Sequence, residues 1–165
     1  MSQKQKESVD VEERQKKAMQ VVNRYSFGST ALGLLPLGVV DLLLVGGVQV
    51  KMISELAKVY DLPFRKSRVE TLIAVLTGAL VSSPINACTA SLVKMIPVVG
   101  AVSGAIAGAA TSSVLTYALG VVFVQHFEAG GNVLNFDPEA MREFFQQTYG
   151  AASGERPVTY AGIKP

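Results

Sequence analysis

Few residues of this chain are of the types that carry out catalysis, and they do not form a catalytic arrangement. The only histidine is His126 and the only cysteine is Cys88, which is too few for a metal site of the usual histidine and cysteine kind. The sequence has no G-x-x-x-x-G-K-[ST] phosphate loop, no strand followed by G-x-G-x-x-G, and no serine in a nucleophile elbow. We therefore predict that the protein is not an enzyme and binds no cofactor or metal.

The most informative single charge is Asp41, which is the only charged residue among residues 28–50. An aspartate in the middle of a membrane costs about 2.5 to 3.5 kcal/mol on insertion scales. Such a group needs an ionic partner or a wet cavity, which makes it a functional candidate. Lys51 and Lys94 are the candidate partners. The alternative is that Asp41 is the N-cap of a helix that continues through Leu42.

Small residues recur every four positions in two apolar runs, and we call each such row a ridge. The ridge of the later run comprises Gly100, Gly104, Gly108, Ser112, Thr116 and Gly120, and the ridge of the earlier run comprises Ala74, Gly78, Ser82, Asn86 and Ala90. On a helix this spacing places small side chains on one face. Each helical glycine costs about 0.8 to 1.0 kcal/mol relative to alanine, so a row of them needs a packing reason.

We predict that the two ridges face each other, with backbones in close contact, in the manner of a glycine zipper. Hydrogen bonds from Ser82 and Asn86 would cross the contact. Three alternatives stay open: a close-packed core helix of a soluble bundle, a ridge that builds a homo-oligomer, and a water-filled pore lined by small residues.

The apolar composition indicates the class of elements that hold these residues. Charged residues make up 17% of the chain, against about 25% in an ordinary soluble domain, and the mean hydropathy is +0.34. The fold prediction is all-α: a helical bundle with a central Gly-rich hairpin, embedded in a membrane and flanked by amphipathic helices. The net charge of +2 is too small to indicate nucleic-acid binding.

Prolines and charges divide the chain into four predicted parts. Helix breaks are expected at Pro36, Pro84 and Pro97. The parts are an amphipathic N-terminal helix with a frayed start (1–27), an apolar helical domain (28–127), a C-terminal amphipathic helix (128–150) and a flexible tail (151–165). Within the apolar domain we expect a Pro-broken segment at 28–50, a helix at 51–61 and a hairpin at 67–125.

Two capping boxes predict where helices begin. Asp10 followed by Glu13, and Ser67 followed by Glu70, have the spacing at which each end satisfies an unpaired amide of the other. The first predicted helix carries basic residues beside its apolar stripe. It therefore lies either on an anionic membrane surface or over the protein's own core.

The C-terminal helix has the clearest start signal. Asp137 is the expected N-cap, Pro138 occupies the first turn, and Phe136 and Met141 form a hydrophobic staple. Gly150 suits the exit from this helix.

Basic residues flank residues 28–50 on both sides, which determines the expected topology. Under the positive-inside rule, both flanks stay in the cytoplasm. A re-entrant or buried pair of half-helices fits this better than one span. No secretory signal is evident, and we expect cytoplasmic termini.

Two motifs resemble a known family. The first is LLPLGVVDLLLVGGVQVKMISELAKVY, with Pro36, Asp41, Gln49, Met52, Ile53 and Tyr60, and the second is KMIPVVGAVSG, with Lys94, Pro97, Gly100 and Gly104. Together they resemble the YcjF-like, GTPase-associated family of unknown function. In that family the domain occurs alone or fused to an Era-like GTPase. The resemblance implies a bacterial inner (cytoplasmic) membrane setting and a GTPase acting in trans. It brings no catalytic residues.

Three hypotheses for function follow. The first is a membrane-associated helical scaffold or adaptor that contacts lipid and partner proteins, with a second copy of itself or a GTPase among the partners. The second is an oligomeric channel or transport subunit with Asp41 near the conduction path. The third is a soluble, partner-binding helical bundle.

Overall fold

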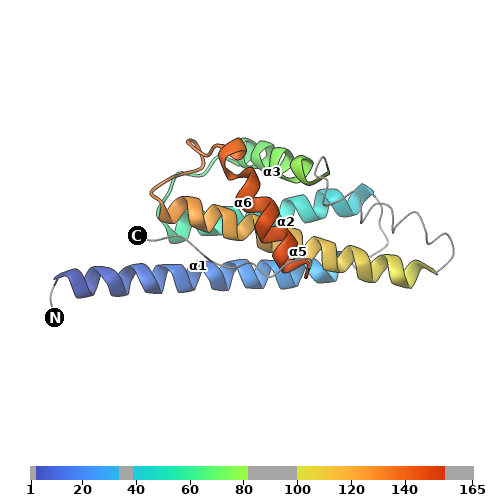
Figure 1. Cartoon of the computed structure of the whole chain (residues 1–165), viewed down its shortest axis with the longest axis horizontal. Coiled ribbons are helices and arrows are strands. Elements are labelled where there is room, and N and C mark those ends of the chain that lie inside the picture. Colours follow the sequence, from blue (N-terminus) through green and yellow to red (C-terminus); the bar gives the residue numbers. More distant parts are fainter. Residues whose placement is uncertain (1–2, 34–38, 82–99, 155–165) are drawn as a thin grey trace.

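A computed structural model describes residues 3–33, 39–81 and 100–154 of the chain. Within these ranges the chain forms helices joined by turns, which confirms the all-α prediction. The helices are α1 (Gln3–Gly33), α2 (Val39–Val59), α3 (Lys66–Val81), α5 (Gly100–Glu128) and α6 (Pro138–Ala152), as Figure 1 shows. The expected tail falls mostly outside the described residues.

Helix α1 is longer than predicted. It begins at Gln3 and not at the Asp10 capping box, and it runs for 31 residues. The glutamine, lysine and glutamate residues before Asp10 are good helix formers, and none of them interrupts the ladder of hydrogen bonds. An ion pair between Glu13 and Lys17 (3.8 Å) adds support four residues apart.

Helix α1 also takes up the start of the segment expected to be broken by proline. It includes residues 28–33, and α2 then begins at Val39. The predicted helix break at Pro36 lies outside the described residues. Helix α2 ends where Asp61 adopts a left-handed conformation (φ 53°), two residues before Pro63. Aspartate tolerates this conformation better than most residues.

The starts of α3 and α6 test two cap predictions with opposite outcomes. Helix α3 begins at Lys66, and the amide of Val69 bonds the carbonyl of Arg65. Ser67 is therefore inside the helix and is not its cap. In α6 the prediction is confirmed, because the Asp137 carboxylate accepts from the amides of Glu139 and Ala140. This helix ends at Ala152, beyond Gly150.

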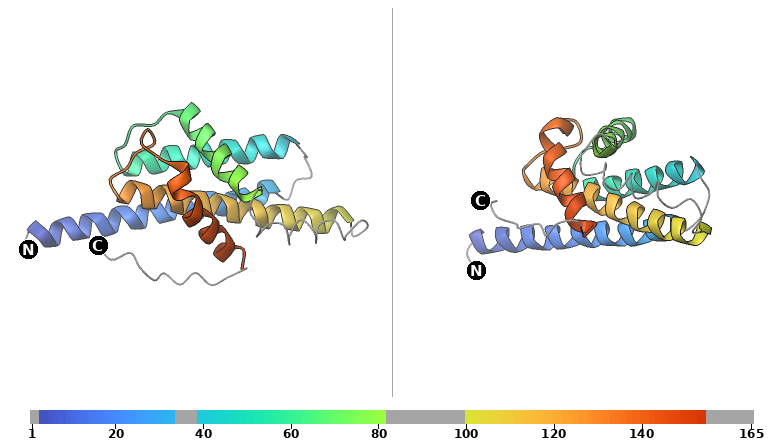
Figure 2. Two further views of the ribbon diagram at one scale, coloured as in Figure 1. Left: turned by 45° about the horizontal axis from the view of Figure 1, so that its top comes forward. Right: turned by 45° about the vertical axis from the view of Figure 1, so that its right-hand side comes forward.

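Helix α5 lies at the centre of the bundle, between α1, α2 and α6. Its most extensive contact is with α1. Gln15 of α1 bonds Glu128, while Ser29 bonds Thr116. From the first bond to the second, the residue number rises in α1 and falls in α5, so these two helices are antiparallel. Helix α2 lies beside them with the opposite direction to α1 (Figures 1 and 2).

Helix α3 packs on α2 and α6 and forms no extensive contact with α5 in the described part of the chain. The prediction that the ridge of residues 74–90 faces the ridge of residues 100–120 is therefore wrong for the part that can be compared. The buried face of α3 is its apolar stripe, formed by Val69, Leu72, Ile73, Leu76 and Leu80. Burying a leucine contributes about 1.5 to 3 kcal/mol, so this stripe determines which face turns inward.

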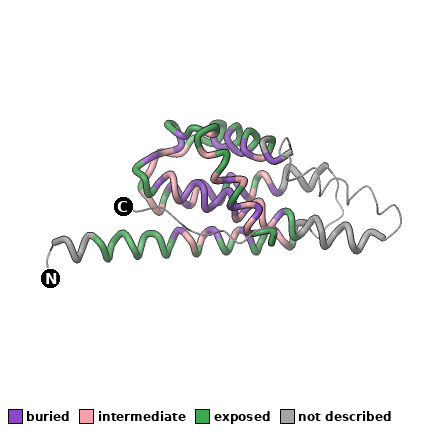
Figure 3. Tube along the Cα trace, in the orientation of Figure 1, coloured by how far each residue is buried: buried purple, intermediate pink, exposed green. Residues whose placement is uncertain are grey.

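The core collects around the C-terminal half of α5. Phe123 is fully buried and stacks on Phe136, with ring centroids 4.6 Å apart. Phe127 meets Phe123 edge to face, and Phe145 of α6 is also fully buried. Figure 3 shows buried residues along this half of α5, whereas the N-terminal part of α1 is exposed.

Candidate functional site

The predicted ridge of α5 has three members whose surroundings are described, and the structure shows a close helix contact at one of them, Gly120. Ser112, Thr116 and Gly120 are all buried. A Cβ added at Gly120 would lie 2.7 Å from both Cγ atoms of Val22 in α1. Only the absence of a side chain lets these two helices approach so closely. At Gly120, the ridge residue in this contact, α5 therefore packs against α1.

Hydrogen bonds between side chains cross the contact between α1 and α5 at Thr116, one turn before Gly120. The hydroxyls of Ser29 and Thr116 are 3.0 Å apart, and the side-chain amide of Gln49 in α2 donates to Thr116 Oγ1 at 3.4 Å. All three residues are buried. We call Ser29, Gln49 and Thr116 the polar layer. It connects α1, α2 and α5, and such bonds stabilise helix pairs where the surroundings offer no water.

A charged cluster joins α1 to α2 beyond the polar layer. The Glu55 carboxylate accepts from the guanidinium of Arg24 and, at 2.5 Å, from the hydroxyl of Tyr25. Burial, together with the neighbouring Glu55 carboxylate, raises the pKa of Tyr25 to about 12. The cluster therefore keeps a protonated phenol as a hydrogen-bond donor at neutral pH.

A second tyrosine, Tyr60, forms a hydrogen bond at the C-terminal end of α5. Tyr60 donates to Glu128 at 3.0 Å, and Gln15 donates to the same carboxylate at 3.2 Å. Burial, followed by the charge of Glu128, raises the pKa of Tyr60 above its usual value. These bonds hold the start of α1 and the end of α2 against the end of α5.

His126 supports the loop between α5 and α6. Its Nε2 is 3.0 Å from the carbonyl oxygen of Asn132 and 3.2 Å from Oδ1 of Asn135. Both partners are oxygen acceptors, so Nε2 carries the proton and donates. A Cβ at Gly131 would lie 2.2 Å from the imidazole. The histidine is thus a structural residue here.

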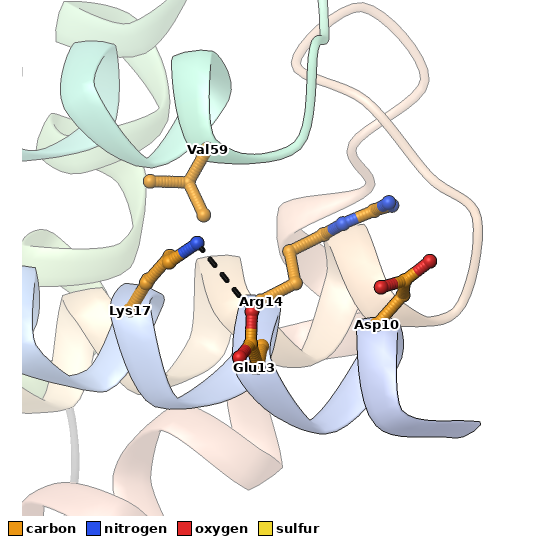
Figure 4. Close-up of a pocket in the computed structure, with 5 residues that line it drawn as sticks. All are labelled: Asp10, Glu13, Arg14, Lys17 and Val59. Carbon is orange, nitrogen blue, oxygen red and sulfur yellow. Dashed lines mark ion pairs between the residues drawn. The ribbon is translucent and has the colours of Figure 1, made fainter. Parts of the chain in front are cut away.

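A surface cleft lies where α1 passes the end of α2. Figure 4 shows the residues that line it, which are Asp10, Glu13, Arg14, Lys17 and Val59. The charges are of both signs, and the cleft is open to solvent. In the described residues no three histidine, cysteine or acidic side chains gather as a metal site would require.

The described helices include one, over Ala110–Glu128, that is long and apolar enough to cross a membrane. Its mean hydropathy is 1.2, and 56% of it is buried inside the bundle. A buried core helix of a soluble protein has the same length and composition, so this feature alone is weak evidence for a span.

Comparison with known proteins shows the family. Residues 2–154 match the family described as "Domain of unknown function (DUF697)". The chain belongs to this family. This DUF697 protein is also 32% identical to "Magnetosome membrane protein 22" of Magnetospirillum gryphiswaldense over 133 residues, which are 80% of the chain and 68% of that relative. No solved structure matches it.

The structure of this DUF697 protein places the other predicted site residues as follows. Gly100, Gly104 and Gly108 belong to α5, but their surroundings lie outside the described part. Gly78 is exposed on α3, and a Cβ there would meet no described atom within 4 Å. The remaining predicted residues, Ser82, Asn86, Pro36, Pro84, Pro97 and Lys94, lie outside the described residues.

The charge pair proposed for Asp41 is partly excluded. Asp41 lies in the first turn of α2, two residues after the helix begins at Val39, although its side chain is not described. Lys51 is exposed on the same continuous helix. Ten residues of helix separate them by about 15 Å, which is too far for an ion pair. Lys51 is therefore not its partner, and the pairing with Lys94 stays a prediction.

The sequence interpretation missed Ser29 and the Arg24, Tyr25 and Glu55 cluster. A signal for Ser29 is present, because Ala18, Val22 and Ser29 follow helical spacing on α1 and are all fully buried. The charged cluster has no such signal, since Glu55 lies about thirty residues from its partners in the sequence.

Proposed function

We propose that this protein is a membrane-associated helical scaffold or adaptor that acts through helix packing and contacts with other proteins. The observation that carries the proposal is its 32% identity, over most of both chains, to a relative named as a magnetosome membrane protein. The apolar helix within α5 supports membrane association by its length and composition.

The adaptor part of the proposal rests on the N-terminal extension of α1, which we define as residues 8–17. These side chains are exposed, and core residues of α1 begin only at Ala18. Helix stability in proteins comes mostly from packing of an apolar face. Gln15 of the extension bonds Glu128 of α5, and the other exposed side chains offer a surface for another protein.

The extension presents both basic and acidic groups. Lys17 is paired with Glu13, and both side chains are about two-thirds exposed. An exposed pair of this kind contributes little to stability, so its charges remain available to a partner. The resemblance to YcjF-like, GTPase-associated proteins supports a GTPase acting in trans as one such partner.

A soluble partner-binding bundle is the second candidate, favoured by the burial of 56% of the apolar window of α5. Carbonate extraction of membranes from cells that express the chain separates the two. The membrane proposal expects the protein in the pellet until detergent is added. Full release by carbonate would exclude an integral association and leave the soluble bundle.

The adaptor surface is tested by crosslinking. A photoreactive residue in place of Lys16 on the extension is expected to form adducts with partner proteins, and the same residue in place of Gln147 on α6 serves as the exposed control. Tagged Era-like GTPases from the same cell would be probed among the adducts. Equal yields at both positions, or adducts at neither, would contradict an adaptor role for α1.

A further inference from the structure

The fold separates charged from uncharged helix segments along its long axis. We define the uncharged end as residues 26–33 of α1, 39–50 of α2, 71–81 of α3 and 100–116 of α5. In these segments Asp41 is the only residue with a formal charge. In the sequence the four segments are far apart. Figure 1 shows that the last turns of α1 and α3 and the first turns of α2 and α5 all point toward the same end of the molecule.

The charge boundary falls at one level on α1 and α2, whereas α5 carries no formal charge from Gly100 until Glu128. The polar layer places Ser29, Gln49 and Thr116 side by side. The last charge of α1 before this level is Arg24, and the first charge of α2 after it is Lys51. Because α1 is antiparallel to α2, both charges lie on the same side of the layer. Arg24 also pairs with Glu55 on that side.

Burial along α5 changes at the same level. From Ala118 to Val124 every residue of α5 is buried by its neighbours. On the other side of Thr116, Ser113, Val114 and Leu115 are half-buried, and Ala110 and Thr111 are exposed. Protein cover over this helix thus decreases where its neighbours lose their charges.

The exposed surface of the uncharged end is unlike an ordinary protein surface. Its exposed residues include Phe27, Ala31, Gly47, Ala74, Val75 and Ala110, and the Phe27 side chain is 82% exposed. A soluble surface carries roughly a quarter to a third charged residues, yet these positions carry none. Contact with a medium that has no water to solvate charges accounts for two features of this end. Its exposed positions carry no charged residues, and little neighbouring protein covers α5 there.

We propose that the uncharged end enters the hydrocarbon of a lipid bilayer end-on, while the N-terminal extension of α1 and the loop between α5 and α6 stay in water. This inference rests on the membrane association proposed above and adds which part inserts. From Thr116 to Gly100, α5 extends about 24 Å, close to the roughly 30 Å of a hydrocarbon core. Along the interior turns of these helices the backbone groups are bonded within the helix, as lipid requires.

Asp41 is the one charged residue in the described segments of the inserted part. It lies in the first turn of α2, and the partial positive charge at a helix N-terminus favours a carboxylate. Within the inserted part of α2, the first turn is therefore the place at which a carboxylate costs least.

Two exposed alanines, one on each side of the polar layer, provide a matched test. Ala110 lies in the uncharged end and Ala129 just after α5, and both are exposed. Purified full-length chains would be mixed with phosphatidylcholine and phosphatidylglycerol vesicles and floated on a density gradient. Ala110→Lys is expected to lower the vesicle-bound to free ratio at least tenfold, and Ala129→Lys to leave it within twofold. Circular dichroism checks that both variants are folded.

The depth of each position is measured with a fluorescent label. Ala110→Cys and Ala129→Cys, each made with Cys88→Ser, would carry an environment-sensitive dye. Nitroxide groups on the lipid chains are expected to quench the dye at position 110, and aqueous iodide to quench it at position 129.

If the chain floats but both positions respond to iodide alone, end-on insertion is wrong and membrane association stands. If the parent chain does not float, both proposals fail. Shielding of position 110 by a second copy, seen as dimers without lipid quenching, also overturns insertion.

Discussion

At the scale of single residues, Gly120 and Val22 determine how closely α1 and α5 approach. A side chain at position 120 has no room, since its Cβ would lie 2.7 Å from two methyl groups of a fully buried valine. The polar layer lies one turn away and adds hydrogen bonds. Packing and hydrogen bonding thus act together on one stretch of α5.

Gly120→Leu is expected to lower the free energy of unfolding by about 1 to 3 kcal/mol or more, because an overfilled contact forces the helices apart. Chemical denaturation, monitored by circular dichroism, measures this change in the free energy of unfolding. The control is Gly47→Ala on α2, where a Cβ meets no described atom within 4 Å. This control should gain up to about 1 kcal/mol of helix propensity. Equal stability of Gly120→Leu and the parent would show that the close contact does not exist.

The raised pKa of the Tyr25 phenol predicts that the folded chain loses stability at high pH. Its pKa is raised to about 12 in the folded chain, first by burial and then by Glu55, whereas an unfolded tyrosine titrates near 10. The unfolded state therefore releases its proton first. The stabilising contribution is complete below about pH 10 and is lost as pH rises toward 12.

Ultraviolet titration of the parent against Tyr25→Phe isolates this phenol. Glu55→Gln is expected to move the titration midpoint of Tyr25 down toward 10, because the carboxylate and its hydrogen bond no longer hold the proton. The midpoint should stay above 10, since burial remains. An unchanged midpoint in Glu55→Gln would contradict the contact.

At the scale of helices, starts and ends follow local chemistry where a strong cap is present. Asp137 and Pro138 begin α6 as the sequence indicates. The Asp10 box fails because the residues before it continue the helix with no cost, and the Ser67 box fails because α3 starts one residue earlier. A capping box determines a helix start only when the preceding chain leaves the helical path.

Asp137→Ala is expected to lower stability by about 1 kcal/mol, because two amides of α6 lose their acceptor. Thermal unfolding measures the change, and Glu143→Ala in the exposed face of α6 is the control. Asp137→Asn should retain most of the cap. If the alanine and asparagine variants unfold at the same temperature, the side-chain cap contributes nothing.

At the scale of the whole molecule, the bundle begins partway along α1. The extension of residues 8–17 is exposed, and Ala18 and Val22 are the first buried residues among those of α1 whose burial is described. Figure 3 shows this exposed portion beyond the core.

Deletion of residues 1–12 is therefore expected to change the free energy of unfolding by less than about 0.5 kcal/mol, because no buried contact is lost. Deletion of residues 1–22 should cost several times more, since it removes the Val22 contact with α5. Denaturant titration compares the two. A large loss in the shorter deletion would place the extension within the folded core.

The sequence alone determined the helical class, the start of α6 and the need for a small residue on α5 at Gly120. These follow from composition, local hydrogen-bonding groups and a fixed period along one chain segment. Which helix fills the contact was decided by the tertiary structure. Nothing within α5 distinguishes α1 from α3 as a partner. The leucine stripe of α3 turned its small residues outward, and Val22 and Ser29 on α1 fit against α5.

The gathering of uncharged segments at one end is likewise a property of the tertiary structure. Each segment is visible in the sequence as an apolar stretch, but their common level depends on helix directions and on bonds such as Gln49 to Thr116. Local patterns report which faces are apolar and where helices begin. Pairing depends on complementary surfaces from residues far apart in the chain, and those surfaces exist only once the helices are packed.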